Sequence, residues 1–454
     1  MLLGKAQPVV FICVSQIIHF YTASQRCRQD NFSKSRNIAS VSLELTMVKS
    51  TGQSAAVQLG SRHRVRAAQP SSVREINRVI VLNLIRLHQP ISRNDLAKQA
   101  RIHCSNVSEI VDELLREGLL CEERAMPRGR GRVPYLISLN GTAILALSID
   151  IRYSTTYIAL GGLGGDLQHT TSIPTPHQPT AFVSALLRAL ERDVMIQPHL
   201  GRGIRQIGVS VPGWVRPTTG EVLWVPSIPS YSGYPLQAEL ERRLSAQVVL
   251  ENNTRLGALA ELWMEEKADG NPIRNFAFVL VGDMGVSAGV VQQGKLYHAS
   301  GDGVSGEFGH MVIDSEGPRC RCSRRGCWQT FIADRATWHR YQPHRRFNSS
   351  SFAELLSAVR RHDASALRAL SETARYLALG LVNIALTLDP GTVILAGEVT
   401  QAWPLIEPHW QRELALVKVP LQVRRARLPL DELLLRGGIL LAFRHFFQPP
   451  SLGW

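Results

Sequence analysis

The stretch GEFGHMVIDSEGPRCRCSRRGC, residues 306–327, places His310, Cys320, Cys322 and Cys327 in the spacing H-x9-C-x-C-x4-C. Three thiolates and one imidazole are the donors of a closed tetrahedral zinc site, in which metal–sulfur distances are ~2.3 Å. The alternative is a group of ordinary buried cysteines, but three of the seven cysteines of the chain fall within eight residues here. Four ligands leave no open position for water or substrate, so the stretch predicts a structural zinc and not a catalytic one.

Composition and charge point to a globular chain with an affinity for polyanions. The 454 residues are 44% hydrophobic and 19% charged, which is typical of a protein with large buried cores. The formal net charge of +14 favours nucleic-acid partners, because neutralising phosphates releases condensed counterions. Residues 61–135 carry 14 Lys and Arg against 8 Asp and Glu, a net charge of +6, so this part is the candidate nucleic-acid module.

The first 46 residues fit neither a membrane anchor nor a signal peptide. The apolar run 9–21 is shorter than the ~20 residues that span a bilayer, and Gln16 and His19 interrupt it. We expect residues 1–46 to be a doubtful extension or a disordered arm, with translation starting at Met47. The other cysteines form no paired framework, which together with a thiolate metal site predicts a cytoplasmic protein without a membrane segment.

Residues 70–138 have the pattern of a winged helix-turn-helix. An apolar stripe begins at Ser72, continues for about four helical turns and stops before Pro90. Ser92 and Asp95 resemble a capping box that opens a short second helix. After a turn over 101–104, a third helix is expected over 106–117, capped by Ser105 and burying residues at i, i+3, i+4 and i+7.

The exposed side of the third helix and a basic loop supply the candidate DNA contacts. A strand, the tip RGRGR (128–132) and a second strand predict a wing whose arginines can follow phosphates or enter a minor groove. Taken singly, the helices could form a small bundle and the tip an interdomain linker, but their order within 70 residues favours DNA binding. The candidate DNA-binding residues are Ser92, Ser105, Asn106, Ser108, Glu109, Arg128, Arg130 and Arg132.

From residue 142 to 447, strands alternate with helices in two similar series. Apolar strands are expected at 144–151, 155–160 and 204–211, and a second series starts at 276–281 after a helix over 254–266. The repetition predicts an α/β fold of two lobes, split near residue 253, with a cleft between them.

Several motifs in this part resemble the ROK family, which unites bacterial sugar kinases with sugar-responsive repressors of the N-acetylglucosamine and xylose type. They are SVPG (210–213), ENN (251–253), GEFGH (306–310), the cysteine cluster and LDPGTVI (388–394). The resemblance covers about 80% of the chain and is specific in the Glu-x-x-His and zinc signatures. It implies a winged helix-turn-helix followed by a two-lobed, actin-like ATPase-type domain with a structural zinc, and a homodimer or homotetramer.

The resemblance also implies a sugar site in the cleft. The family's sugar ligands correspond to Asn252, Glu307 and His310, and Gln329 stands where the family has a Glu two residues after the last zinc cysteine. His310 would serve both metal and ligand through its two ring nitrogens. Asn253 would keep a hydroxyl contact, and Ser227 stands at a pocket-lining position. Alternatively, Asn252 and Asn253 end a strand with local hydrogen bonds, and Glu307 pairs with Arg325.

The kinase machinery of the family is altered at four places. Asn253 replaces the Asp that acts as general base, and an amide cannot take up a proton at neutral pH. Arg152 and Tyr153 replace the glycines of the first phosphate loop, Met284 replaces a hydroxyl residue in the second, and Glu398 replaces a glycine near the C-terminus. We therefore predict that the chain is no enzyme.

Together these features predict a transcriptional regulator, most simply a repressor of carbohydrate genes. It would bind double-stranded operator DNA and be released by a sugar or sugar phosphate that changes the closure of the lobes. Two alternatives stay open: an ATP-dependent kinase of a hexose or N-acetylamino sugar, and a regulator controlled by capture of another protein.

Overall fold

A computed structural model describes residues 70–126, 134–142, 144–200, 203–216, 219–267, 271–298, 306–348 and 350–448. The expected N-terminal arm over 1–46 and the wing residues Arg128, Arg130 and Arg132 lie outside the described residues. Within these ranges, no helix combines the length and the apolar character needed to cross a membrane.

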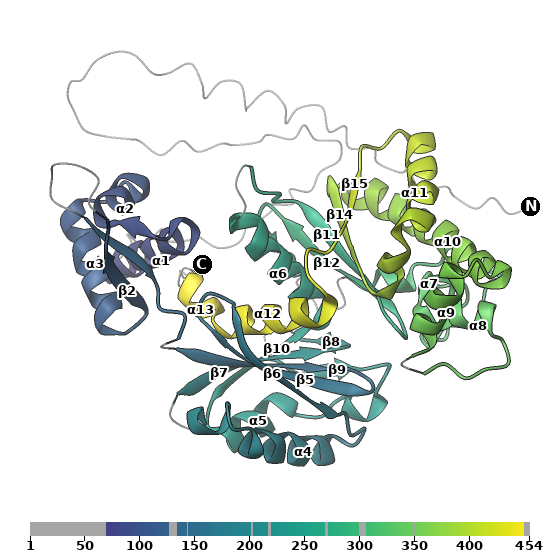
Figure 1. Ribbon diagram of the computed structural model, residues 1–454, viewed down its shortest axis with the longest axis horizontal. Coiled ribbons are helices and arrows are strands. Elements are labelled where there is room, and N and C mark those ends of the chain that lie inside the picture. The colour runs from purple at the N-terminus through teal and green to yellow at the C-terminus, as the bar shows by residue number, and fades with distance from the viewer. Residues whose placement is uncertain are drawn as a thin grey trace, which may run out of the picture. The chain divides into compact units, whose positions relative to one another are not determined.

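The first part is a three-helix unit with a small antiparallel sheet (Figure 1). Its α3 buries Val107, Ile110, Val111 and Leu114 on one face, as the i, i+3, i+4, i+7 pattern predicts. The strands pair in the order β1-β3-β2. The elements are α1 (Pro70–His88), β1 (Ile91–Ser92), α2 (Arg93–Ala100), α3 (Cys104–Arg116), β2 (Leu120–Arg124) and β3 (Tyr135–Leu139).

The N-terminus of α3 differs from the sequence prediction. The helix begins at Cys104, and its N-cap is His103, whose ring accepts a hydrogen bond from the backbone N–H of Ser105. Ser105 was expected to be the cap, but it lies inside the first turn and its hydroxyl is 2.8 Å from His103 Nδ1. The predicted cap of α2 is confirmed, since the Ser92 side chain accepts from Asp95 N.

The first lobe is a mixed sheet in the order β10-β7-β4-β5-β6, with α4 and α5 on one face and α12 on the other (Figure 1). Gly208 lets α12 approach closely, because a Cβ there would lie 2.0 Å from the backbone oxygen of Gly438. The elements are β4 (Leu145–Ile151), β5 (Thr155–Gly162), β6 (Leu167–Pro174), α4 (Pro179–Arg192), β7 (Ile204–Val211), β8 (Trp214–Val215), β9 (Val222–Trp224), α5 (Leu236–Leu244), β10 (Gln247–Asn252) and α12 (Leu430–Ala442).

The second lobe has the same kind of sheet, in the order β13-β12-β11-β14-β15. Along β11, Ala277, Val279 and Val281 belong to the core under α10, whereas Phe276, Phe278 and Leu280 belong to the core shared with α6. Every residue of β11 is therefore buried. The elements are α6 (Asn253–Lys267), β11 (Phe276–Val281), β12 (Val286–Gln292), β13 (Lys295–Leu296), α7 (Gln329–Ile332), α8 (Asp334–Tyr341), α9 (Ser351–Arg360), α10 (Ala364–Leu388), β14 (Thr392–Ala396), α11 (Trp403–Val417) and β15 (Gln422–Arg425). The last helix, α13 (Arg444–Phe447), follows α12 and contacts α1 and α12.

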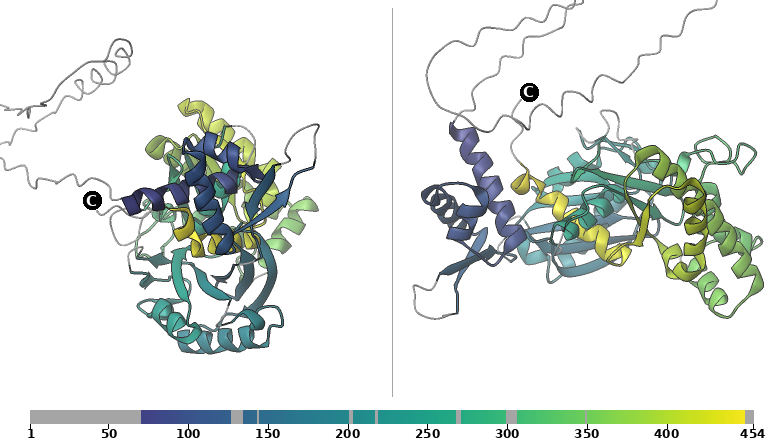
Figure 2. Two further views of the ribbon diagram at one scale, coloured as in Figure 1. Left: turned by 90° about the vertical axis from the view of Figure 1, so that its left-hand side faces the viewer. Right: turned by 90° about the horizontal axis from the view of Figure 1, so that it is seen from above.

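The N-terminal unit of α1–α3 and β1–β3 (residues 70–139), called the winged unit below, shares a core with the first lobe. Val81, Leu82 and Ile85 of α1 belong to one buried cluster with Ile439 and Phe443, at the end of α12. Helix α1 also contacts α13 and α6 (Figure 2). The two parts are therefore joined by apolar packing in addition to the chain itself.

Candidate functional site

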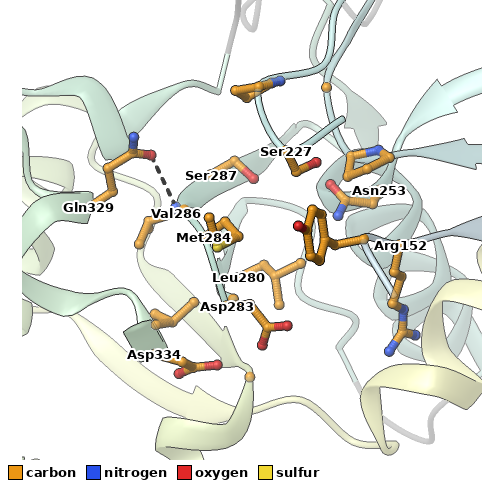
Figure 3. Close-up of a pocket in the computed structure, with 18 of the residues that line it drawn as sticks. Arg152, Ser227, Asn253, Leu280, Asp283, Met284, Val286, Ser287, Gln329 and Asp334 are labelled. Atoms are coloured by element: carbon orange, nitrogen blue, oxygen red, sulfur yellow. Dashed lines mark hydrogen bonds between the residues drawn. The ribbon is translucent and has the colours of Figure 1, made fainter. Parts of the chain in front are cut away.

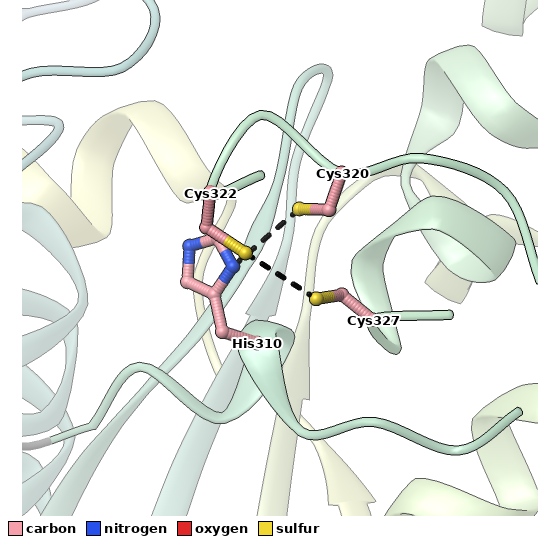
Figure 4. A group of neighbouring side chains, drawn as sticks. All are labelled: His310, Cys320, Cys322 and Cys327. Carbon is pink, nitrogen blue, oxygen red and sulfur yellow. Dashed lines mark hydrogen bonds between the residues drawn. The ribbon is translucent and has the colours of Figure 1, made fainter. Parts of the chain in front are cut away.

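The four predicted metal ligands lie together in the structure (Figure 4). Their donor atoms are all within 4.8 Å of one another. Cys320 Sγ is 3.5 Å from His310 Nδ1, and Cys322 Sγ is 3.5 Å from Cys327 Sγ. A tetrahedral zinc with ~2.3 Å bonds to sulfur separates its ligands by about 3.8 Å, so the donor set fits such an ion.

Short backbone contacts fold the cysteine loop around this point. The pairs Val312–Cys327 and Arg319–Arg325 form isolated antiparallel bridges, and Ser323 takes a left-handed φ of 73°. Burial opposes ionisation of Cys322, but hydrogen bonds from the backbone and side chain of Arg324 outweigh it and lower the pKa of this thiol to about 7. The loop thus favours the thiolate at Cys322, whereas burial and the neighbouring sulfurs raise the pKa of the Cys327 thiol to about 12.

A cavity of about 240 Å³ lies beside the metal cluster, lined from both lobes (Figure 3). Of the predicted sugar residues, five line it: Ser227, Asn252, Asn253, Glu307 and Gln329. His310 is absent from the lining, but its Nε2 is 4.0 Å from a Glu307 oxygen, while its Nδ1 faces Cys320. One ring nitrogen therefore faces the Glu307 carboxyl and the other faces the cysteine cluster.

Asn252, at the end of β10, and Asn253, at the start of α6, differ in which of their hydrogen-bonding groups already have partners within the protein. Asn252 is 6% exposed; its amide donates to Gly213 O at 2.9 Å, and its carbonyl accepts from the N–H of Thr254. This is the hydrogen-bonded strand end that the sequence left open. Asn253 accepts from Thr254 N at 2.8 Å, and among the described residues no partner is found for its amide nitrogen. Asn253 is thus the better placed of the two for a ligand.

Glu307 is half-buried at the wall of the cavity, with 18% of its side chain exposed. Burial raises the pKa of its carboxyl to about 7, although Trp214 and Arg255 act in the opposite direction. The alternative pairing of Glu307 with Arg325 is wrong, because the Arg325 guanidinium donates to Gly317 O within the cysteine loop. Glu307 therefore remains available to a ligand in the cavity.

Near the cysteine cluster, sequence reasoning missed two polar groups of this cavity, Trp214 and Arg321. The Trp214 indole N–H makes no hydrogen bond of standard geometry, but it lies close enough to Glu307 to lower the pKa of that carboxyl, whereas the predicted Ser227 hydroxyl is buried without a partner. Arg321 also lines the cavity and donates to Pro226 O at 3.1 Å. Trp214 follows the SVPG motif directly, and Arg321 lies between two metal ligands, so their positions beside known motifs were the only signal.

The residues of α3 predicted to contact DNA lie on the side opposite its apolar face. Ser105, Asn106 and Glu109 are exposed and Ser108 is half-buried. Ser92, the predicted contact before α2, is 9% exposed, and its hydroxyl donates to Asp95 Oδ2 while capping α2. Ser92 therefore has a structural role, and the exposed candidates among the described residues are those at the start of α3.

A buried arginine links the winged unit to α6. Arg86 of α1 is 5% exposed; it pairs with Glu266 at 2.7 Å and lies over the Trp263 ring at 4.1 Å. Its neighbour Asn83 donates to the backbone oxygen of Phe447. Because α6 starts at Asn253 in the cavity and has 15 residues, one straight helix of about 22 Å connects the cavity to the winged unit.

The model of the ROK family matches residues 146–417, more than half of the chain. The chain belongs to the ROK family. The xylose repressor of Bacillus subtilis is 26% identical over 353 residues, which are 77% of this chain and 88% of that protein. The DNA-binding transcriptional dual regulator NagC of Escherichia coli is 25% identical over 345 residues, which are 74% of this chain and 84% of that protein.

Solved structures agree on the ROK fold. A ROK family transcriptional regulator, described as a homologue of the Escherichia coli Mlc protein, superposes with a TM-score of 0.69 at 24% identity. It covers 83% of this chain and 97% of its own. The ROK hexokinase of Thermus thermophilus has a TM-score of 0.54 at 27% identity, over 66% of this chain and 99% of its own. The regulator match extends further along the chain than the kinase match.

The far end of the cavity holds one arginine and several carboxyl groups. Arg152 pairs with Asp150 at 2.6 Å and also with Asp431 of α12. The carboxyls of Asp283, Asp334 and Glu398 line the same end. Burial is the main cause that raises the pKa of all three, and that of Asp334 rises well above its usual range, because it is fully buried beside the other two. Asp334 was not predicted, because nothing in its local sequence marks it.

Proposed function

We propose that the protein is a sugar-responsive, DNA-binding transcriptional repressor of carbohydrate genes. It would bind operator double-stranded DNA through α3 and the wing, as a homodimer or homotetramer in the cytoplasm, and respond to a sugar or sugar phosphate. The named relatives support this, since they are repressors or regulators of xylose and N-acetylglucosamine genes by name. Dimer symmetry would place two α3 helices on an approximately palindromic site.

One observation carries the proposal: α6 joins a cavity that contains an unsatisfied buried hydroxyl to α1, and α1 packs against α3, whose outer face is exposed. Unpartnered buried groups are costly, and a polyhydroxylated ligand can supply the missing partner of Ser227. A ligand that contacts Asn253 acts on the first residue of α6, while Glu266 near its end holds Arg86. A change in lobe closure would then move the two readers relative to each other.

The same geometry argues against phosphoryl transfer. A triphosphate needs close backbone approach and cations, whereas Arg152 is already engaged by two carboxylates and three further carboxyls line that end. Asn253 lacks the proton-accepting oxygen that a general base requires. The zinc proposed at His310, Cys320, Cys322 and Cys327 would be structural, since it would have four protein ligands.

DNA binding with and without sugars tests the proposal directly. Purified full-length protein is titrated against fluorescent DNA from upstream of its own gene, with glucose, xylose, N-acetylglucosamine and their 6-phosphates. We expect salt-sensitive, sequence-specific binding that one of these ligands weakens by roughly 5- to 150-fold. Sugar-dependent ADP formation at an enzyme-like rate would overturn the proposal in favour of a kinase, and sugar-independent DNA binding would favour control by another protein.

An Arg86→Met variant examines the route between cavity and reader. It should retain sugar affinity and most DNA affinity but lose part of the sugar's effect on DNA binding. Arg345→Met is the matched control, because Arg345 also pairs with a glutamate, Glu354, and lies over a tryptophan ring at 5.3 Å, far from α1 in sequence. Equal sugar responses in both variants and wild type would exclude this route.

A further inference from the structure

The Gln329 side chain makes two contacts within the protein that would not be expected of a residue that binds a sugar. It is the first residue of α7, two positions after Cys327. Its Nε2 lies 3.2 Å from Cys320 Sγ, a metal-ligand sulfur. Its Oε1 accepts from the backbone N–H of Val286, at the start of β12, at 3.5 Å (Figure 3). The side-chain amide therefore spans from the cysteine cluster to the lining of the cavity.

The orientation of the amide follows from its surroundings. If the two ends were exchanged, the carbonyl oxygen would face a thiolate and the amide hydrogens would face the Val286 N–H, so both contacts would become repulsive. The oxygen also lies in a tight space, since a Cβ on Gly285 or Gly309 would lie 3.0 or 2.9 Å from it. These two glycines leave room for the amide and hold it in place.

We propose that Gln329 is an outer-shell partner of the metal site, donating a hydrogen bond to the metal-bound Cys320 thiolate. Three thiolates and one imidazole around a divalent ion leave the site with a net negative charge, which hydrogen-bond donors stabilise. The glutamate that the family resemblance leads one to expect at this position would offer no donor and would place a second anion beside the sulfur. This role replaces the direct sugar contact predicted from the sequence, and it leaves ligand recognition to Glu307, Asn253, Ser227 and Trp214.

The Gln329 amide also links the cysteine loop to β12. Val286 begins the strand that lines the cavity, and the same side chain holds the metal loop, so Gln329 fixes the distance between them. Loss of the amide should loosen the metal loop without removing any group that a sugar needs. Gln329 is therefore a positioning residue for the metal loop.

A chelator competition with the Gln329→Leu variant tests this inference, which rests on the proposed zinc site. The full-length wild-type protein is first shown to bind one zinc; failure at this step would overturn the metal proposal itself. Zinc affinity of Gln329→Leu should then be roughly 10- to 100-fold weaker than that of wild type. The Co²⁺-substituted protein should show a shifted thiolate-to-metal charge-transfer band, which a purely structural defect away from the metal would not produce.

Two further variants keep the result interpretable. Gln168→Leu removes an amide that donates to Gly141 O in the first lobe, and it should bind zinc as wild type does. Gln329→Glu retains the volume and polarity of the side chain but has no hydrogen-bond donor, so it should also bind zinc more weakly than wild type. This variant provides the test if Gln329→Leu does not fold. Wild-type zinc affinity in the Gln329 variants, or a loss of sugar affinity as large as that of a Glu307 variant in zinc-loaded protein, would overturn the inference.

Discussion

The two ends of the cavity differ in what they offer a ligand. At the end next to the cysteine cluster, the Ser227 hydroxyl is buried without a partner, and the Trp214 indole N–H lies close to the Glu307 carboxyl. At the other end, Arg152 pairs with Asp150 and Asp431, although its Nη2 and Asp334 Oδ1 are buried without hydrogen-bond partners. The first end therefore offers mainly uncharged hydrogen-bonding groups, whereas the second end offers an ion-paired cation surrounded by carboxyl groups.

This contrast supports the proposal that the chain binds a sugar without transferring a phosphoryl group. Neutral hydroxyl groups can be bound by donors and acceptors that stay uncharged, so the sugar end needs few changes. A phosphate chain needs positive potential and close backbone approach, and the side chains of Arg152, Asp334 and Glu398 remove both from the far end. The differences can be tested one end at a time.

The largest effect is expected from removing a metal ligand. Cys327 is fully buried, so Cys327→Ser takes away one of four donors and leaves a polar hydroxyl inside the loop. We expect zinc affinity to fall more than roughly 100-fold and the second lobe to melt at lower temperature, because metal binding and loop folding are linked. Zinc content and thermal unfolding measure both.

Cys104→Ser is the control for that experiment. Cys104 is exposed at the start of α3 and has no part in the cluster, so its replacement should change neither measurement. An unchanged zinc content in Cys327→Ser would contradict the assignment of the cluster.

The next largest effect is expected at the sugar end. Glu307→Gln keeps the shape of the side chain but replaces a charge-assisted acceptor by a neutral amide, a loss of about 1.5–3 kcal/mol. Affinity for the effector sugar, measured by calorimetry, should fall roughly 10- to 100-fold. Asp334→Asn, at the other end of the same cavity, should leave it unchanged, and equal losses in both variants would show that the two ends do not differ as argued.

Asp334 should impose a pH dependence on stability. Its pKa is raised in the folded protein, so at pH values above the ordinary aspartate range the unfolded chain is ionised while the folded chain keeps the proton. Folding then takes up a proton, and the free energy of unfolding falls as pH rises, by up to about 1.4 kcal/mol per pH unit.

Asp334→Asn removes this slope. Urea unfolding between about pH 5 and 7 should show that the variant gains stability relative to wild type as pH rises. Asp166→Asn serves as control, because Asp166 is exposed at the surface. A constant difference between Asp334→Asn and wild type over this range would contradict the raised pKa.

The sequence indicated the α3 face and the metal ligands because both depend on local spacing. The buried positions of α3 follow helical periodicity, and the four ligands belong to one short loop. Asp334 and Trp214 had no such signal, since their role arises only when distant strands bring the cavity walls together. The cap of α3 was assigned to Ser105 because serine favours that position, whereas the His103 ring occupies it.

Gln329 and Asn252 show a second limit of sequence reasoning. Both stand at positions where the family resemblance implies a sugar ligand, yet their amides bond to Cys320 and Gly213. A polar residue in a motif indicates that a polar partner exists, but only coordinates tell whether that partner is a ligand or the protein itself. The adjacent Asn253 is the same residue type, yet no partner for its amide nitrogen is found among the described residues.

The smallest effect is expected from restoring the missing base. Asn253→Asp returns the proton acceptor of the ROK kinases, and in a working kinase such a base contributes roughly 10²–10⁴-fold. Here the phosphate end would still hold Arg152 in its ion pairs and still carry Asp283, Asp334 and Glu398, so ADP formation with any sugar should stay at the wild-type background. A coupled ADP assay measures this, with the Thermus thermophilus hexokinase as positive control. A 100-fold rise in turnover from this single change would mean that the far end binds nucleotide after all, and that only one side chain separates this regulator from a kinase.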